Sequence, residues 1–205
     1  MKRIFISLLL VFAAAAAAES ARAQGLQGLL NLFANAKAAK ADAHTAGELL
    51  TAEQLTATTW VYSAPQIVYS GNSSMATVAI AALRTQMPDI AKTLGLNAGS
   101  DSVAFLGDGT AAMTNGENKA SVPYMYDPAT GYVSFTLTRN GTTEAFPATA
   151  TAKDGVLTVL FDAETTIATL LRMAPELKDN SSLLIIKAVV DKYPGIKIGA
   201  TFDAR

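Results

Sequence analysis

The sequence predicts a mainly β fold with helical insertions, in which eight antiparallel strands close into a small barrel. Apolar and polar side chains alternate between residues 102 and 162, for example from Val133 to Thr138. This period of two is typical of strands with one buried and one solvated face. Turn dipeptides such as Asp154-Gly155 separate the alternating runs. One further strand on each side of this meander gives eight strands, a number that can close a small barrel.

Turns divide the meander, Ser102 to Asp162, into six expected strands. The Asn-Gly and Asp-Gly pairs predict type I′ hairpins, because these residues tolerate positive φ at both central positions. Longer runs predict wider turns. The turns are Asp108-Gly109, Asn115-Gly116-Glu117-Asn118, Asp127-Pro128-Ala129-Thr130-Gly131, Asn140-Gly141 and Asp154-Gly155. Turn chemistry leaves two architectures open, the closed barrel and an open antiparallel sheet covered by helices on one face.

Residues 1–23 have the pattern of a signal peptide. Lys2 and Arg3 precede an apolar stretch, and Ala21-Arg22-Ala23 fits the small-x-small rule for cleavage before Gln24. The apolar stretch is short for a membrane span. The sequence contains no cysteine, so we expect neither a bacterial lipid anchor nor a disulfide framework. The expected product is a soluble exported protein, periplasmic or secreted, without a membrane anchor.

Residues 24–50 predict a leader helix followed by a linker. Apolar residues spaced by three and four favour a short amphipathic helix that packs on the domain, and a membrane-surface segment is the alternative. They are Leu26, Leu29, Leu30, Leu32 and Phe33. The polar tract from Ala34 to Thr45 predicts a flexible linker.

Residues 51–205 are expected to form the barrel domain. Thr51 and Gln54 have capping-box spacing before a first strand at residues 58–69, which Pro65 should break or bulge. A helical insertion is expected at about residues 73–95. Pro88 should end one helix there and begin a shorter one.

The second helical region is expected at residues 163–193. Asp162 and Asn180 are placed to cap its two helices, and Pro194-Gly195 should end the second. An alternating strand from Ile196 to Phe202 completes the domain.

Composition and motif content argue against several functions. A net charge of −1 gives no basic surface for nucleic acid. His44, the single histidine, falls in the expected linker, and no cysteine is present, so a catalytic dyad or a zinc site is not expected. Gly107-Asp108-Gly109 lacks the helix that cradles a phosphate. The acidic side chains are scattered, so we expect no catalytic residues, no metal, no cofactor and no enzymatic activity.

The segment Leu55-Thr56-Ala57-Thr58-Thr59-Trp60 resembles the start of a lipocalin-like barrel, where a Gly-x-Trp closes one end. Thr58 stands at the glycine position. Three further segments are similar to a family of secreted lipocalin-like bacterial proteins of unknown function. They are Tyr124 to Val133, Leu157 to Ala163, and Tyr193-Pro194-Gly195. The resemblance covers Leu50 to Phe202 and implies a lipocalin-like barrel in the envelope or outside the cell, with no catalytic residues.

Aromatic residues on the expected strands are the candidate ligand-binding set. They are Trp60, Tyr62, Tyr124, Tyr126, Phe135 and Phe146. These side chains could line a cavity for a small apolar or amphipathic molecule, with tyrosine hydroxyls as polar contacts, or they could fill the core. The face Phe146, Ala148, Ala150, Ala152 leaves space for a ligand or for a closely packed helix. The sequence therefore predicts an apolar carrier, with a solid structural or protein-interaction module as the alternative.

Overall fold

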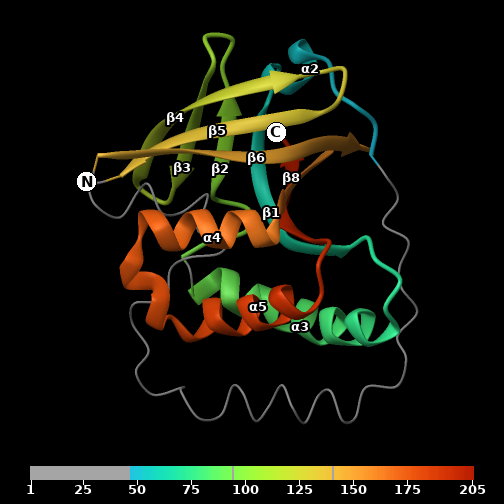
Figure 1. Ribbon diagram of the computed structural model, residues 1–205. Coiled ribbons are helices and arrows are strands. Elements are labelled where there is room, and N and C mark those ends of the chain that lie inside the picture. The colour runs from blue at the N-terminus through green and yellow to red at the C-terminus, as the bar shows by residue number, and fades with distance from the viewer. Residues whose placement is uncertain (1–46, 94, 140) are drawn as a thin grey trace.

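The computed structural model describes residues 47–93, 95–139 and 141–205, and within that part the eight strands close into an antiparallel barrel in chain order (Figure 1). The expected leader helix and most of the linker fall outside these residues. The strands are β1 (Thr59–Tyr69), β2 (Ser102–Phe105), β3 (Thr110–Asn115), β4 (Asn118–Asp127), β5 (Tyr132–Arg139), β6 (Thr142–Lys153), β7 (Val156–Asp162) and β8 (Ile196–Ala204). Closure between β1 and β8 excludes the open sheet.

The hairpin turns match the sequence prediction in part. Asp154 and Gly155 both have positive φ, 52° and 78°, as a type I′ turn requires. At Asp108-Gly109 the prediction of a two-residue turn is wrong. The β2–β3 connection runs from Leu106 to Gly109. Asp108 does not have positive φ, and its carboxylate accepts a hydrogen bond from the Thr110 amide.

Two further turns can be compared with their predictions. The turn after Asn115 is tighter than expected, because β3 ends at Asn115 and β4 begins at Asn118. The Asp127 to Gly131 turn is confirmed, with Gly131 at a φ of 68°. Asn140 lies outside the described residues.

The barrel consists of a short three-stranded part and a longer five-stranded part. Strand β2 pairs with β1 along residues 59–61, and β4 pairs with β5 along residues 124–127. Beyond these short joins β1 continues to Tyr69 beside β8, and β5 continues to Arg139 beside β6. The sheet β5-β6-β7-β8-β1 thus extends past the end of β2-β3-β4.

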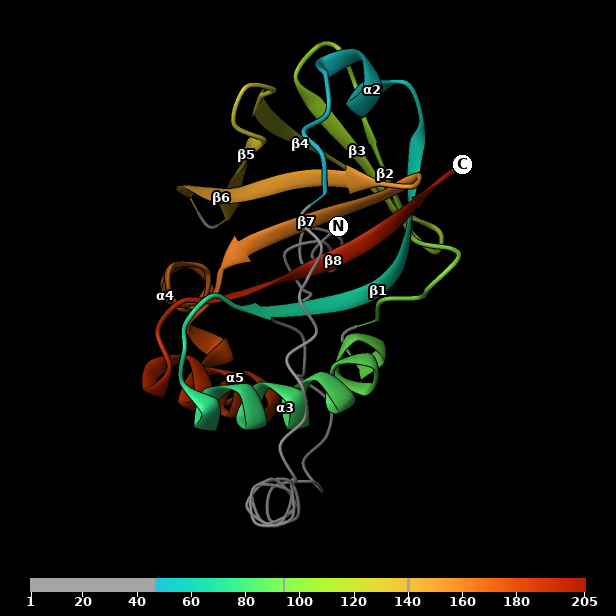
Figure 2. The same cartoon turned by 90° about the vertical axis from the view of Figure 1, so that its right-hand side faces the viewer.

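A layer of helices covers the extension of the five-stranded sheet (Figures 1 and 2). It comprises α3 (Ser74–Thr93), α4 (Ala163–Met173), a 3₁₀ turn η2 (Pro175–Asp179) and α5 (Ser181–Lys192). Helix α3 packs on β1, and α4 packs on β6, β7 and β8. The caps agree with the prediction, since the side chains of Asp162 and Asn180 accept hydrogen bonds from Thr165 N at 2.8 Å and Leu183 N at 3.0 Å. The helices therefore take the place of strands at this end of the barrel.

Helix α3 is one continuous helix where the sequence predicts two. Pro88 lies inside a continuous helix and does not divide it into two, so that prediction is wrong. Met87 and Ala91 on either side of Pro88 are buried, and the burial of both turns offsets the hydrogen bond that proline removes. No helix in the described ranges has the length and apolar character needed to cross a membrane.

The opposite end of the barrel is closed by the segment before β1. Glu48 and Ala152 of β6 exchange backbone hydrogen bonds of 2.7 and 2.9 Å. Helix α2 (Ala52–Thr56) follows, with the expected capping box at Thr51. Leu55 on this helix is fully buried. The two ends of the barrel are thus closed by different devices, a single helical turn here and a helical layer opposite.

Candidate functional site in the barrel interior

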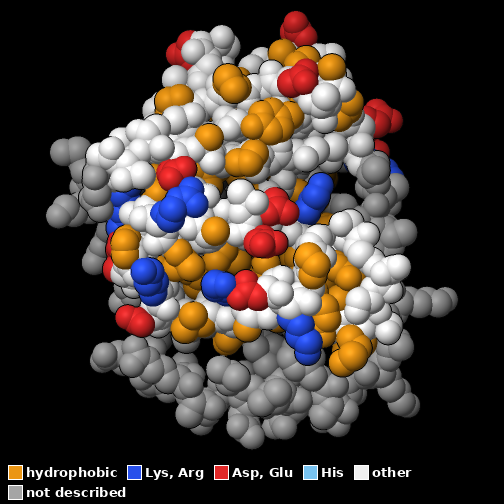
Figure 3. Space-filling model, viewed as in Figure 1, with side chains coloured by type: hydrophobic (Ala, Val, Ile, Leu, Met, Phe, Trp, Pro, Cys, Tyr) orange, Lys and Arg blue, Asp and Glu red, His pale blue; other side chains and the backbone are white. Residues whose placement is uncertain are grey.

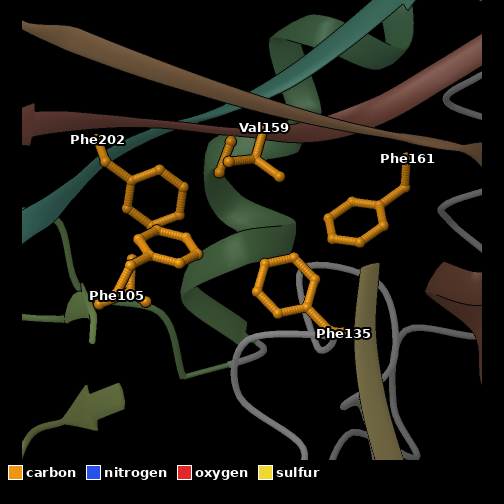
Figure 4. A pocket seen from close by; sticks show the side chains of 7 residues that line it. Phe105, Phe135, Val159, Phe161 and Phe202 are labelled. Atoms are coloured by element: carbon orange, nitrogen blue, oxygen red, sulfur yellow. The ribbon is translucent and has the colours of Figure 1, made fainter. Parts of the chain in front are cut away.

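The inner face of the barrel surrounds a small apolar cavity near its centre (Figure 4). Its volume is about 10 Å³. The lining side chains come from β2, β5, β7 and β8, and they are Val103, Phe105, Phe135, Val159, Phe161, Ala200 and Phe202. A space of this size holds about one water molecule. Binding sites for small organic ligands are usually several hundred Å³.

The cavity is small because phenylalanine rings fill most of the interior. The ring centroid of Phe135 lies 6.1 Å from that of Phe105 and 6.0 Å from that of Phe161. These separations are typical of packed aromatic pairs. In Figure 4 the labelled rings converge on the cavity from different strands. The sequence predicts a cavity large enough for a small ligand, and the cavity described here is much smaller than such sites.

Three of the six candidate residues are brought together by strand register. Tyr124 of β4 is paired with Phe135 of β5, which is paired with Phe146 of β6. Of the six, Phe135 lines the cavity. Phe146 is fully buried beside it in the core. The register therefore makes a row of aromatic side chains across three strands, and this row packs the interior.

The hydroxyls of Tyr124 and Tyr126 donate to backbone carbonyls at the barrel rim. Tyr124 bonds to Leu106 O at 3.0 Å, and Tyr126 bonds to Leu50 O at 2.8 Å. Partial burial raises the pKa of both phenols above the usual tyrosine value. In this arrangement the two hydroxyls hold neighbouring segments and do not point freely into the interior as contacts for a ligand.

Trp60 and Tyr62 lie on β1, away from the row on β4 to β6. Trp60 donates through Nε1 to Leu55 O at 2.9 Å. The Tyr62 ring makes an edge contact with Phe202, with centroids 6.0 Å apart. Burial, and secondarily the negative charge of Asp101, raise the pKa of the Tyr62 phenol to about 12. Both side chains therefore belong to the core, and Tyr62 stays protonated at physiological pH.

Asp101 is a buried carboxylate that sequence reasoning did not single out. Its side chain is 2% exposed. Oδ2 accepts hydrogen bonds from Asn97 N at 2.8 Å and from Asn115 Nδ2 at 2.7 Å, and Oδ1 accepts one from Gly116 N at 3.3 Å. These bonds join the loop before β2 to the β3–β4 hairpin. They give Asp101 a structural role.

Sequence reasoning missed several residues of the cavity wall. Phe105, Phe161 and Phe202 line the cavity, whereas the sequence analysis emphasised tyrosines. Parity along the strands carries the information, because Phe161 shares the face of Val159, and Phe202 shares the face of Ala200. The sequence does not show the position of each ring along the barrel axis, because that position depends on strand register.

The charged side chains of the described residues do not form a second candidate site. Among the described residues, surface ion pairs join Arg139 with Glu176, Arg172 with Glu144, and Lys187 with Asp191. Within the described ranges no group of three or more His, Asp or Glu side chains is placed to hold a metal ion.

The fold and its interior define a small antiparallel barrel with an apolar, largely filled core. The chain belongs to the family described as Lipocalin-like domain (DUF4923), whose model matches residues 29–204. This confirms the resemblance drawn from the sequence. Searches of curated proteins and of solved structures returned no match for the chain.

Proposed function

We propose that this protein is an exported, non-catalytic module that works through its surface and whose barrel interior is a solid core. The observation that carries this proposal is the volume of the central cavity, about 10 Å³, which is more than an order of magnitude below typical ligand sites. Small barrels have interiors that side chains alone can fill. The proposal takes up the structural or interaction module, the alternative that the sequence left open.

The absence of catalysis is part of the proposal. In the described part of the chain several acidic residues take part in surface ion pairs, turns and a helix cap, and the buried Asp101 is held by backbone and amide donors. The interior offers phenylalanine and valine side chains. Nothing in this arrangement supplies a nucleophile next to a base.

Export is supported by the pattern of residues 1–23 and is also proposed. Cleavage before Gln24 is checked by the intact mass of the exported protein and by fractionation. A protein that begins at Gln24 and remains soluble agrees with the proposal. Retention of Met1, or recovery in detergent-extracted membranes, contradicts it.

A second candidate function is the uptake of a small apolar molecule at the barrel centre. The observation favouring it is that the cavity wall consists entirely of apolar side chains. A ligand could enter there if Phe135 or a neighbouring ring changed rotamer, and it would need to be compact. This is the carrier expected from the sequence, restricted to ligands that displace aromatic rings.

Binding of apolar molecules separates the two candidates. An apolar fluorescent probe, and a panel of fatty acids, sterols, bile acids and benzene, are titrated while the emission of Trp60, the single tryptophan, is followed. The solid-core proposal expects no saturable binding by the parent protein. Phe135→Ala is the positive control, because removing a buried ring opens a cavity that should admit benzene.

A saturable site in the parent protein overturns the solid core. Such binding supports the second candidate, a carrier of small apolar molecules, if the variant Ala200→Leu abolishes it and stays folded. The larger side chain on β8 would fill the cavity. Because Phe135→Ala is expected to cost about 3 to 5 kcal/mol, Val159→Ala provides a milder control with a smaller added cavity.

A further inference from the structure

Exposed apolar side chains lie on the outer surface of β4, β5 and β6 and on the segment that precedes α2. Leu49, Met125 and Tyr132 are 49%, 68% and 43% exposed. Pro147 of β6 lies on the same face. Figure 3 shows hydrophobic side chains gathered over these strands in the upper half of the view. We call these four residues the outer apolar face.

Strand register places Met125 and Pro147 on the outside of the sheet, on either side of Ser134. Met125 is paired with Ser134, and Ser134 with Pro147, so the three positions form one row across three strands, in which Ser134 is buried at 5% exposure. Tyr132 is two residues from Ser134 and points to the same side, which makes it a diagonal neighbour of Met125. Exposed apolar side chains that are grouped on one face, when the patch is large, mark surfaces that bind a partner or another part of the chain.

The chain reaches the barrel at the edge of this same face. Glu48 is bonded to Ala152, and a Leu49 methyl lies against Gly131, where an added Cβ would be 2.7 Å from it. Gly131 immediately precedes Tyr132. Gly47, Glu48 and Leu49 therefore lie beside the outer apolar face, and not beside the helical layer on the other side of the barrel.

The preceding segment has the composition and the reach to cover this face. Its apolar cluster, Leu26 to Phe33, is separated from Gly47 by a tract that spans up to about 45 Å when extended. The family match begins at residue 29, so most of this cluster falls within the matched domain. The cluster therefore belongs largely to the matched domain, and the chain that follows it joins the barrel beside the outer apolar face.

The charges beside the outer apolar face are opposite in sign to those that follow the apolar cluster in the sequence. Glu48 and Asp127 are exposed beside the outer apolar face, and Asp127 is paired with Tyr132 in the register. Lys37 and Lys40 follow the apolar cluster in the sequence. Opposite charges at the rim of an apolar contact favour one orientation over others.

We propose that the apolar cluster Leu26 to Phe33 docks on the outer apolar face of its own barrel. The contact covers Met125 and Tyr132 in the exported protein. It is independent of the barrel interior, and it holds whether the core is solid or takes a ligand.

The test uses the chain from Gln24 to Arg205 with a nitroxide label on Asn31→Cys. The parent has no cysteine, so this position is labelled alone. Paramagnetic broadening of backbone amide signals then reports which surface lies near the label. Docking predicts loss of most of the signal intensity at Met125 and Tyr132. Met75 and Leu184, exposed at 67% and 49% on the helical layer, should keep theirs.

Two additional samples make the outcome specific. Leu30→Asp in the labelled chain should restore the Met125 and Tyr132 signals, because it places a charge in the apolar contact. A mixture of labelled, isotopically unenriched chain with unlabelled, ¹⁵N-enriched chain should show no broadening. Broadening centred on Met75, broadening without a preferred site, or broadening in the mixed sample would overturn the proposal, the last by showing that the cluster binds a second copy.

Discussion

The Trp60 indole nitrogen lies 2.9 Å from the Leu55 carbonyl oxygen and donates a hydrogen bond to it inside the barrel end. Both residues are buried, at 3% and 0% exposure. The bond joins the short helix α2 to the first strand. It is the contact through which the start of the domain closes one end of the barrel.

Trp60→Phe should lower the free energy of unfolding by about 1 to 3 kcal/mol, because the buried Leu55 carbonyl loses its donor. Urea unfolding followed by circular dichroism measures the change, since the variant has no tryptophan. Tyr126→Phe is the matched control. It removes a 2.8 Å bond to Leu50 O at a half-buried hydroxyl, where water can replace the lost partner, so it should cost about 1 kcal/mol or less. Equal losses in the two variants would contradict this account of the barrel end.

Stability should fall at high pH in a way that depends on Tyr62. Its folded pKa is raised to about 12, against 10.0 for the free side chain. The folded state therefore holds the proton more tightly than the unfolded state. Its contribution to stability is fully present below pH 10 and is lost as the pH rises from about 10 to about 12.

Urea unfolding between pH 9 and pH 12 tests this expectation. Across that window the parent protein should lose more free energy of unfolding than Tyr62→Phe, whose ring cannot ionise. The ultraviolet absorbance of phenolate gives an independent reading of the titration. Parallel stability curves for the two proteins would show that Tyr62 is not the group responsible.

Gly199→Ala should prevent stable folding. A Cβ at this position would lie 1.8 Å from the Val159 carbonyl oxygen in the neighbouring strand β7, and backbone atoms of a closed barrel cannot move aside cheaply. Gly107→Ala is the matched control, because nothing lies within 4 Å of the added atom. Thermal melting should place the control within about 0.5 kcal/mol of the parent. A folded Gly199→Ala with near-parent stability would show that β7 and β8 can separate.

Asn115→Ala should destabilise the protein by about 1.5 to 3 kcal/mol, because its Nδ2 donates to the buried carboxylate of Asp101. The same amide donates to Gly95 O at 2.7 Å. Asn118→Ala, an exposed neighbour in the same hairpin, should have little effect. Chemical unfolding of both variants measures the contrast, and a small loss at Asn115 would mean that solvent satisfies Asp101.

Ile186→Asp should cost about 3 kcal/mol or more, because Ile186 on α5 is 1% exposed and the new charge would have no partner. Leu184→Asp on the same helix, at 49% exposure, should be tolerated. Leu171→Asp on α4 should fall between them, since Leu171 is partly buried against the core. Melting temperatures give the order. If Ile186→Asp melted close to the parent temperature, the helical layer would not be part of the folded core.

Short-range chemistry made much of this fold predictable. Alternation from Val133 to Thr138 and the turn at Asp154-Gly155 depend on a few neighbouring residues. The turn appears as expected, and so does the alternation except at Ser134, which is 5% exposed although it was expected on the solvated face. The caps at Asp162 and Asn180 are equally local. Pro88 shows where local reasoning fails, because burial of Met87 and Ala91 keeps α3 continuous.

Sequence alone determined the eight strands, the alternation of their faces and the membership of a lipocalin-like family. It did not determine how full the barrel is. That depends on the register that brings Phe135 beside Phe105 and Phe161, and register joins residues far apart in the chain. Tertiary structure also decided that helices close the end of the barrel where β2 to β4 stop. The five-stranded sheet extends beyond these strands, and its apolar face must be buried against another element.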